Sequence, residues 1–248
     1  MMRILFIGPH TPESEWLCKA LRESTHSVLW STNFAAGIRG AQEEAFDAVM
    51  FVPPASAPLT GLSEVVSELR QVSSDAIFAL VVKESSAAER AAFLTSGIDV
   101  CFAKPWSFVD MHEKILALHR TATHGRLGAH DSEPRLRLDT QTRELVDGAA
   151  RLAVTKREFL VLECLLRHFE LPVKHEQILR YAWCDEDESD IATIPPLIWR
   201  LRRKIQGRLP DVAIVTEQAC GYRLAHRRES TALPFRAEST TMAHRAYV

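Results

Sequence analysis

The sequence lacks the long apolar runs that a membrane-spanning protein needs. Its longest apolar stretches are far shorter than the ~20 residues of a transmembrane helix. The apolar part of the N-terminal stretch MMRILFIGPH is too short for a secretory signal peptide. The five cysteines are scattered without CxxC spacing, which favours a reducing compartment. We therefore expect a cytoplasmic protein without a membrane segment.

The sequence also lacks the residue clusters that bind metals or carry out catalysis. No Cys/His cluster has the spacing of a zinc finger. His119, His124 and His130 lie near one another, and we expect them to be solvated linker residues rather than metal ligands. Where the expected strands end there is no pair of acids and no nucleophile beside a base. The sequence therefore predicts no enzymatic activity, no metal and no cofactor.

What is present is an ordinary globular composition, 46% hydrophobic and 25% charged, in a chain long enough for one or two domains. Residues 1–120 hold 10 Lys or Arg and 14 Asp or Glu, whereas residues 136–225 hold 14 of each. In the second part the signs are segregated. CDEDESD (184–190) carries five acids and LIWRLRRKIQGR (197–208) carries five bases. A charge run most often marks a solvated helix face, so its meaning depends on its structural context.

Residues 1–120 alternate between short apolar runs and helical patterns. The apolar runs predict five strands, at 3–7, 27–31, 48–52, 76–82 and 99–103. Helical patterns lie at roughly 13–23, 34–45, 61–72, 86–96 and 107–120. This alternation predicts a parallel sheet with helices on both faces. Short right-handed connections favour the flavodoxin-like doubly wound strand order 2-1-3-4-5.

The pattern changes after residue 120. Residues 121–135 lose periodicity and gather Thr, Gly, His, Ser and Pro, which predicts a linker. Three short strand candidates follow, at 136–138, 143–146 and 150–153. Asp147 and Gly148 form a hairpin turn signal. The tail at 226–248 has no sustained apolar pattern and is expected to be disordered, so the second folded domain spans 136–225.

Three helices are expected in this domain. Thr155 and Glu158 have capping-box spacing and predict the start of the first helix. The second helix is expected at 174–183. Strand candidates at 212–216 and 221–224 read as a closing hairpin.

The third helix has an apolar face and a basic face. Thr193 is its expected N-cap, and Pro195 and Pro196 occupy the first turn, where a missing N–H costs little. Apolar residues at helical spacing give the inward face: Ile194, Ile198, Leu201 and Ile205. The basic residues lie mostly off this face. Three helices, an outward basic face on the third and a hairpin after it predict a winged helix-turn-helix.

The chain resembles the OmpR/PhoB-type response regulators over about residues 2–225. Family motifs are similar to VTKREFLVLECLL, LPVKHEQILRYAW, TIPPLIWRLRRKI and IVTEQACGYRL in this sequence. The resemblance implies a receiver domain in residues 1–120 and a winged-helix DNA-binding domain in residues 136–225. It also implies double-stranded DNA as partner and the function of a sequence-specific transcriptional regulator.

The expected DNA contacts combine this resemblance with the chemistry of the third helix. Arg and Lys bind phosphates, and Arg can pair bidentately with guanine. We expect contacts from the helix and the start of the wing: Trp199, Arg200, Arg202, Arg203, Lys204 and Thr216. Arg200 and Arg203 are expected to be the principal ones. Arg202 could instead pair with an acid such as Glu163, and this alternative stays open.

The resemblance fails at the phosphorylation site of the receiver. Gly8 and Pro9 stand where the family has the acids that hold Mg²⁺, and Val52 stands where it has the phosphorylated Asp. Val81 replaces a hydroxyl residue, and only Lys104 persists. Mg²⁺ needs oxygen ligands, and transfer of a phosphoryl group to a receiver needs a carboxylate nucleophile. We expect a degenerate receiver that is not phosphorylated at this site.

Nearby acids are not expected to replace the missing ones. Asp47 lies at the opposite end of its strand from Val52. Glu13 and Glu15 are expected on the first helix, outside the pocket. The regulator is therefore expected to act independently of aspartate phosphorylation.

Two further contacts are expected. By resemblance, residues of about 86–120 pair in a homodimer, and their mixture of apolar and charged side chains suits a two-fold interface as well as a solvated face. The acidic loop at 184–192 could contact RNA polymerase. The alternative function is a protein-interaction module, with RNA polymerase or another regulator as partner, that binds no specific DNA.

Overall fold

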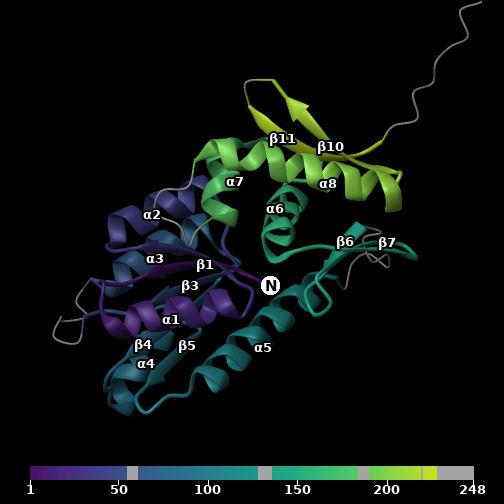
Figure 1. Cartoon of the computed structure of the whole chain (residues 1–248). Coiled ribbons are helices and arrows are strands. Elements are labelled where there is room, and N and C mark those ends of the chain that lie inside the picture. The colour runs from purple at the N-terminus through teal and green to yellow at the C-terminus, as the bar shows by residue number, and fades with distance from the viewer. Residues whose placement is uncertain (55–60, 128–135, 184–189, 219, 228–248) are drawn as a thin grey trace, which may run out of the picture.

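The structure is a computed structural model of the chain, and it describes residues 1–54, 61–127, 136–183, 190–218 and 220–227. Two domains follow one another (Figure 1). We call residues 1–127 the receiver-like domain and residues 136–227 the winged-helix domain. Within the described residues, no helix is both long and apolar enough to cross a membrane.

The receiver-like domain alternates strands and helices as predicted. Its elements are β1 (Arg3–Ile7), α1 (Pro12–Glu23), β2 (Ser27–Ser31), α2 (Phe34–Glu43), β3 (Ala48–Phe51), α3 (Leu62–Val72), β4 (Ile77–Val82), α4 (Ala87–Thr95), β5 (Val100–Ala103) and α5 (Phe108–Leu127). The strands are parallel in the order β2-β1-β3-β4-β5, which confirms the predicted topology.

Alternation along the strands fills two apolar layers. In β1, Ile4 and Phe6 pack with α1 and α5 on one face, whereas Leu5 and Ile7 pack with α2 and α3 on the other. Both faces are therefore covered, and this explains why the strands are continuous apolar runs. Because helices cover both faces, the amino ends and the carboxyl ends of the strands are the parts of the sheet left for contacts and ligands. We call these two rows of strand ends the amino edge and the carboxyl edge.

Helix α5 corrects the predicted linker. It runs to Leu127, so residues 121–127 are helical, and the rest of the predicted linker, residues 128–135, lies outside the described part of the chain. Adding residues to an existing helix is cheap, even for poor helix formers such as Gly125. His119 is therefore a helix residue, and its Nε2 atom lies 3.8 Å from Asp47 Oδ1. His124 is also in the helix, whereas His130 lies outside the described residues.

The winged-helix domain contains the three predicted helices between two small sheets. Its elements are β6 (Leu136–Asp139), β7 (Glu144–Asp147), β8 (Ala150–Ala153), α6 (Lys156–Arg167), β9 (Val173–Lys174), α7 (His175–Ala182), the 3₁₀ helix η1 (Ile191–Thr193), α8 (Ile194–Arg208), β10 (Val212–Glu217) and β11 (Gly221–His226). The sheet orders are β6-β7-β8 and β10-β11-β9.

Local signals fix several starts and turns in this domain. Thr155 and Glu158 form the predicted capping box at the start of α6. The two-residue strand β9 was not predicted, because it is too short to show a period. It pairs with β11 at Gly221, where a Cβ atom would lie 2.0 Å from the Val173 oxygen. Only glycine allows this approach.

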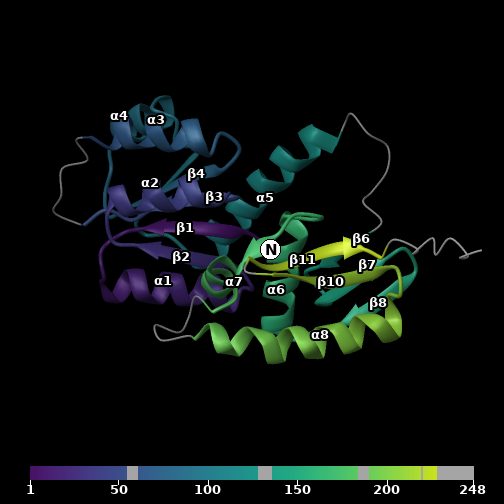
Figure 2. The same cartoon turned by 90° about the horizontal axis from the view of Figure 1, so that it is seen from above.

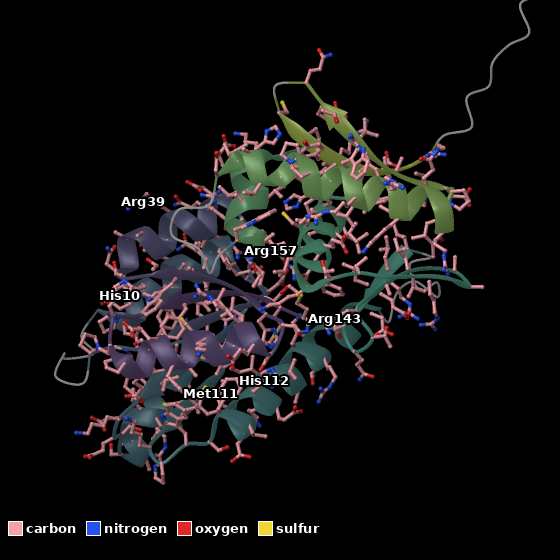
Figure 3. All side chains as sticks on the ribbon, in the orientation of Figure 1. His10, Arg39, Met111, His112, Arg143 and Arg157 are labelled. Carbon is pink, nitrogen blue, oxygen red and sulfur yellow. The ribbon has the colours of Figure 1, made fainter. Side chains whose placement is uncertain are left out.

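The two domains meet at the amino ends of the receiver strands. Helix α7 packs on β2, and both views show it beside the sheet of the receiver-like domain (Figures 1 and 2). Within the winged-helix domain, Arg157 of α6, labelled in Figure 3, contacts the end of α7. Its Nη1 atom donates to the Ala182 carbonyl at 2.9 Å, and its Cζ atom lies 5.0 Å from the Trp183 ring centroid.

Candidate functional site

Helix α8 has one buried face and one exposed face. Its buried side chains recur every three or four residues: Ile194, Leu197, Ile198, Leu201 and Ile205. The opposite face carries Trp199, Arg200 and Arg203, which are all exposed. Trp199 is 57% exposed, which is high for an indole that usually packs inside. Figure 2 shows α8 along the outside of the molecule.

Arg200 and Arg203 provide the charge of this face. In the part of the chain that the structure describes, neither guanidinium forms an ion pair with a carboxylate. The Cζ atom of Arg203 lies 4.8 Å from the centroid of the Trp199 ring, a cation–π distance. Both cations are therefore available to an anionic partner.

Arg202 fixes α8 to the wing, which is the hairpin of β10 and β11. Its Nε atom donates to the Ile214 carbonyl at 2.8 Å, and its Nη2 atom donates to Thr216 Oγ1 at 2.7 Å. It does not pair with Glu163, whose Oε1 atom lies 3.4 Å from Arg167 Nη2. The alternative that Arg202 pairs with an acid such as Glu163 was therefore wrong in its partner, because its guanidinium donates to Ile214 and Thr216 of β10. Thr216 is exposed and keeps its O–H free to donate.

Lys204 fixes α8 to α6. Its Nζ atom lies 2.7 Å from Glu158 Oε2, and Glu158 is only 4% exposed. Burial acts to raise the pKa of Glu158, but hydrogen bonds from Lys204 and Thr155 outweigh it and hold this pKa below its usual range. A capping-box acid thus also anchors the third helix. Sequence reasoning missed this role because the two residues are far apart in the chain.

The wing carries a neutralised acid. Glu217 Oε1 accepts a hydrogen bond from Arg223 Nε at 2.7 Å. Arg223 also lies 3.7 Å from Glu170. Among the described wing residues, Gln218 is exposed. The acidic loop at 184–189 and the tail from residue 228 lie outside the described residues.

The second candidate site is a pocket at the carboxyl ends of β1, β3 and β4. Its volume is about 330 Å³, and it is lined by apolar and polar side chains, which include Pro9, Glu13, Val52, Val81, Lys83 and Lys104. Val52 and Val81 are buried. At Gly8 a Cβ atom would lie 2.7 Å from the Val52 oxygen, so the backbones are too close for a larger side chain. The five residues predicted for this pocket therefore lie together.

One acid does reach this pocket, which corrects the prediction for Glu13. It lies on α1 as expected, but its Oε2 atom pairs with Lys104 Nζ at 2.8 Å. Lys104 is therefore neutralised rather than free. The first turn of α1 points at the pocket mouth, so a residue on the helix can line it. Within the described residues, no group of three or more His, Cys, Asp or Glu is placed to hold a metal.

Asp47 lies at the amino end of β3, far from the pocket, as predicted. Its carboxylate is bound by Arg167 of the winged-helix domain and by the Arg3 N–H at 2.7 Å. Burial acts to raise the pKa of Asp47, but hydrogen bonds from His119, Arg167 and Arg3 hold this pKa far below its usual range. The sequence offered no signal for this contact between domains.

Comparisons with known proteins agree with this architecture. Residues 149–224 match the family model described as "Transcriptional regulatory protein, C terminal". The transcriptional regulatory protein CusR of Escherichia coli (strain K12) is 24% identical over 223 residues, 90% of this chain and 97% of CusR. The response regulator MprA of Mycobacterium ulcerans is 29% identical over 168 residues, 66% of this chain and 72% of MprA.

Solved structures include DrrB, a Thermotoga maritima OmpR/PhoB homologue. It is 19% identical, with a TM-score of 0.38, and the match covers 91% of this chain and 100% of DrrB. A likeness at this TM-score supports no further conclusion.

Proposed function

We propose that this chain, which belongs to the OmpR/PhoB-type response regulators, binds specific double-stranded DNA and regulates transcription without phosphorylation of its receiver. The observation that carries the proposal is the exposed face of α8, where two cations lie beside an exposed indole without an acidic partner among the described residues. A helix with such a face fits the major groove.

The residues of α8 divide into two roles in this proposal. Arg200 and Arg203 contact DNA, because their guanidiniums are exposed and can reach phosphates or the O6 and N7 atoms of guanine. Trp199 supports Arg203 and adds apolar contact. Arg202 and Lys204 mainly position the helix, because their donors already bind β10 and Glu158. Thr216 donates its O–H to a phosphate.

Independence from phosphorylation rests on the chemistry of the pocket. Val52 is neither a nucleophile nor a metal ligand, and Gly8 and Pro9 offer no carboxylate. Glu13, the acid that lines the pocket, is paired with Lys104. Glu13 is thus the one carboxylate of the described pocket lining, and a single acid paired with a lysine does not supply the set of oxygen ligands that Mg²⁺ requires.

The proposed dimer uses the face of α4, β5 and α5 within about residues 86–120. Leu94 is 48% exposed and Val109 is 65% exposed. No residue of α4 is buried. A helix without a buried residue gains stability from a second copy, and a symmetric pair would also present two copies of α8 to two half-sites. The proposed RNA polymerase contact at 184–192 lies mostly outside the described residues.

The test replaces both exposed cations of α8. Arg200→Ala with Arg203→Ala is expected to weaken binding to a selected DNA site by ~30-fold or more, because a specific base contact contributes about 1–3 kcal/mol. Fluorescence anisotropy measures the affinity, and circular dichroism checks the fold. Arg151→Ala is the matched control, because Arg151 is exposed on β8 and its ionic partner among the described residues is Glu144, at 3.3 Å. Unchanged affinity in the double variant would contradict the assignment of α8.

A further inference from the structure

Among the described residues, two ion pairs join the receiver-like domain to the winged-helix domain. Asp47, at the amino end of β3, binds Arg167 at the end of α6, and one of its two contacts joins Oδ1 to Nη1 at 3.0 Å. Glu43, at the end of α2, lies 2.6 Å from Arg180 of α7. Both acids belong to one domain and both bases to the other. The charges of the two surfaces are therefore complementary.

A buried polar chain lies between these pairs. The Arg3 guanidinium is 0% exposed and binds Glu44 at 2.8 Å and Ser27 Oγ at 2.6 Å. The Ser27 hydroxyl in turn donates to the carbonyl of Tyr181 in α7 at 2.7 Å. That carbonyl belongs to the last turn of α7, whose oxygens have no partner within the helix. A side chain of one domain thus satisfies a helix end of the other.

The apolar contacts of this surface are also shared. The Tyr181 ring is 2% exposed, and Arg3 Cζ lies 4.7 Å from its centroid. Met1, at the start of the receiver-like domain, packs against the core of the winged-helix domain. Burial lowers the pKa of its α-amino group, which lies among Glu163, Asp47 and Arg167. Separation of the domains would break the hydrogen bond from Ser27 to Tyr181 and expose the apolar surface of Tyr181 and Met1 to water.

The exposed face of α8, which we propose binds DNA, is not covered by the contact between the domains. Trp199, Arg200 and Arg203 are exposed while α7 is docked on β2. The pocket at Val52 lies at the other edge of the sheet, at the carboxyl ends of the strands. The contact between the domains and the receiver pocket therefore lie at opposite ends of the strands.

We propose that the surface formed by Arg3, Ser27, Glu43, Asp47, Arg167 and Arg180 is a clasp. It holds the winged-helix domain docked on the amino edge of the receiver sheet, with α8 facing outward, so that the two domains act as one body. The docking does not depend on the proposed function. Its consequence for DNA binding rests on the proposed function: if α8 binds DNA, binding requires no release of α8 from the receiver-like domain.

The test breaks the clasp by charge reversal in the full-length chain. Arg167→Glu with Arg180→Glu places like charges opposite Asp47 and Glu43. We expect small-angle X-ray scattering to show a radius of gyration several ångström larger than that of the wild type, with helix content unchanged by circular dichroism. Adding Glu43→Arg restores one opposite-charge pair and is expected to reverse part of this increase. Glu43 and Arg180 are 55% and 43% exposed, so both positions tolerate the change.

The control is Arg151→Glu, which reverses an exposed charge inside the winged-helix domain. It is expected to leave the radius of gyration unchanged. An unchanged radius in the folded double variant would overturn the clasp, and so would an equal increase in the control. Because no DNA is present, neither result depends on whether the chain binds specific sites.

Discussion

At the scale of single residues, the close approach of Gly8 and Val52 leaves no room in the receiver pocket for an acidic side chain at position 8. A Cβ atom at Gly8 would lie 2.7 Å from the Val52 carbonyl oxygen, so an acid at this position requires the ends of β1 and β3 to move apart. Val52 is 8% exposed and packs with the apolar layer under α1 and α5. The proposed loss of phosphate chemistry thus involves the backbone as well as the side chains.

We expect that a single acid at Val52 does not make the receiver pocket a phosphorylation site. Wild type and Val52→Asp are incubated with acetyl phosphate and Mg²⁺, and intact mass is measured. We expect no phosphoryl increment in either, because Gly8 and Pro9 still provide no metal ligand. An increment in the wild type that disappears in Asp47→Asn would reveal phosphorylation at the domain contact. An increment in Val52→Asp alone would show that the pocket retains a metal site.

At the scale of elements, two imidazoles join β2 to α5. His26, just before β2, accepts a hydrogen bond at Nδ1 from the Met2 N–H at 3.0 Å. Its Nε2 therefore carries the proton and donates to His112 Nε2 at 2.7 Å. Figure 3 labels His112 on α5. Burial lowers the pKa of His26 to about 3, and His112, the α-amino group and His119 act in the same direction, whereas Asp47 acts to raise it.

The His26–His112 pair predicts a loss of stability in mild acid. The unfolded chain protonates His26 near its ordinary pKa of 6.5, whereas the folded chain does so only near 3. The stabilisation is therefore complete above pH 6.5 and is lost as the pH falls toward 3. Its size is on the order of a few kcal/mol in the free energy of unfolding.

Urea unfolding across this pH range measures the effect. His26→Gln is expected to be less stable at neutral pH and to lose less stability on acidification than the wild type. The comparison isolates His26, because carboxylates titrate equally in both proteins. Parallel pH profiles in the two proteins would contradict the role of this pair.

Most helices and strands could be predicted from the sequence, whereas their side-chain contacts could not. Strands and helices of the receiver-like domain follow apolar periodicity, which is a local property, and they lie within a few residues of the prediction. The end of α5 was missed because polar residues, too, can extend an existing helix. The roles of Lys204 and Arg202 were not predictable, because their partners Glu158 and Ile214 are brought close only by packing.

At the scale of the whole molecule, the two edges of the receiver sheet have different properties. At the carboxyl edge, Gly8, Pro9 and Val52 stand where the resemblance implies acids, whereas the amino edge holds a dense set of charged side chains at the contact between the domains. The pairs that join the domains are separated by more than a hundred residues in the chain, so no pattern in the sequence indicates them. The docked arrangement leaves the basic face of α8 exposed.

The most direct measurement is selection of genomic DNA fragments by the purified, unmodified full-length protein at ~150 mM salt, where nonspecific binding is weak. We expect enrichment of a few sites that contain two half-sites about 10–11 base pairs apart, which is one helical turn and suits a symmetric dimer. Arg200→Ala with Arg203→Ala should abolish this enrichment. A wild-type profile no more selective than that of the double variant would contradict the claim that the unphosphorylated chain reads specific DNA.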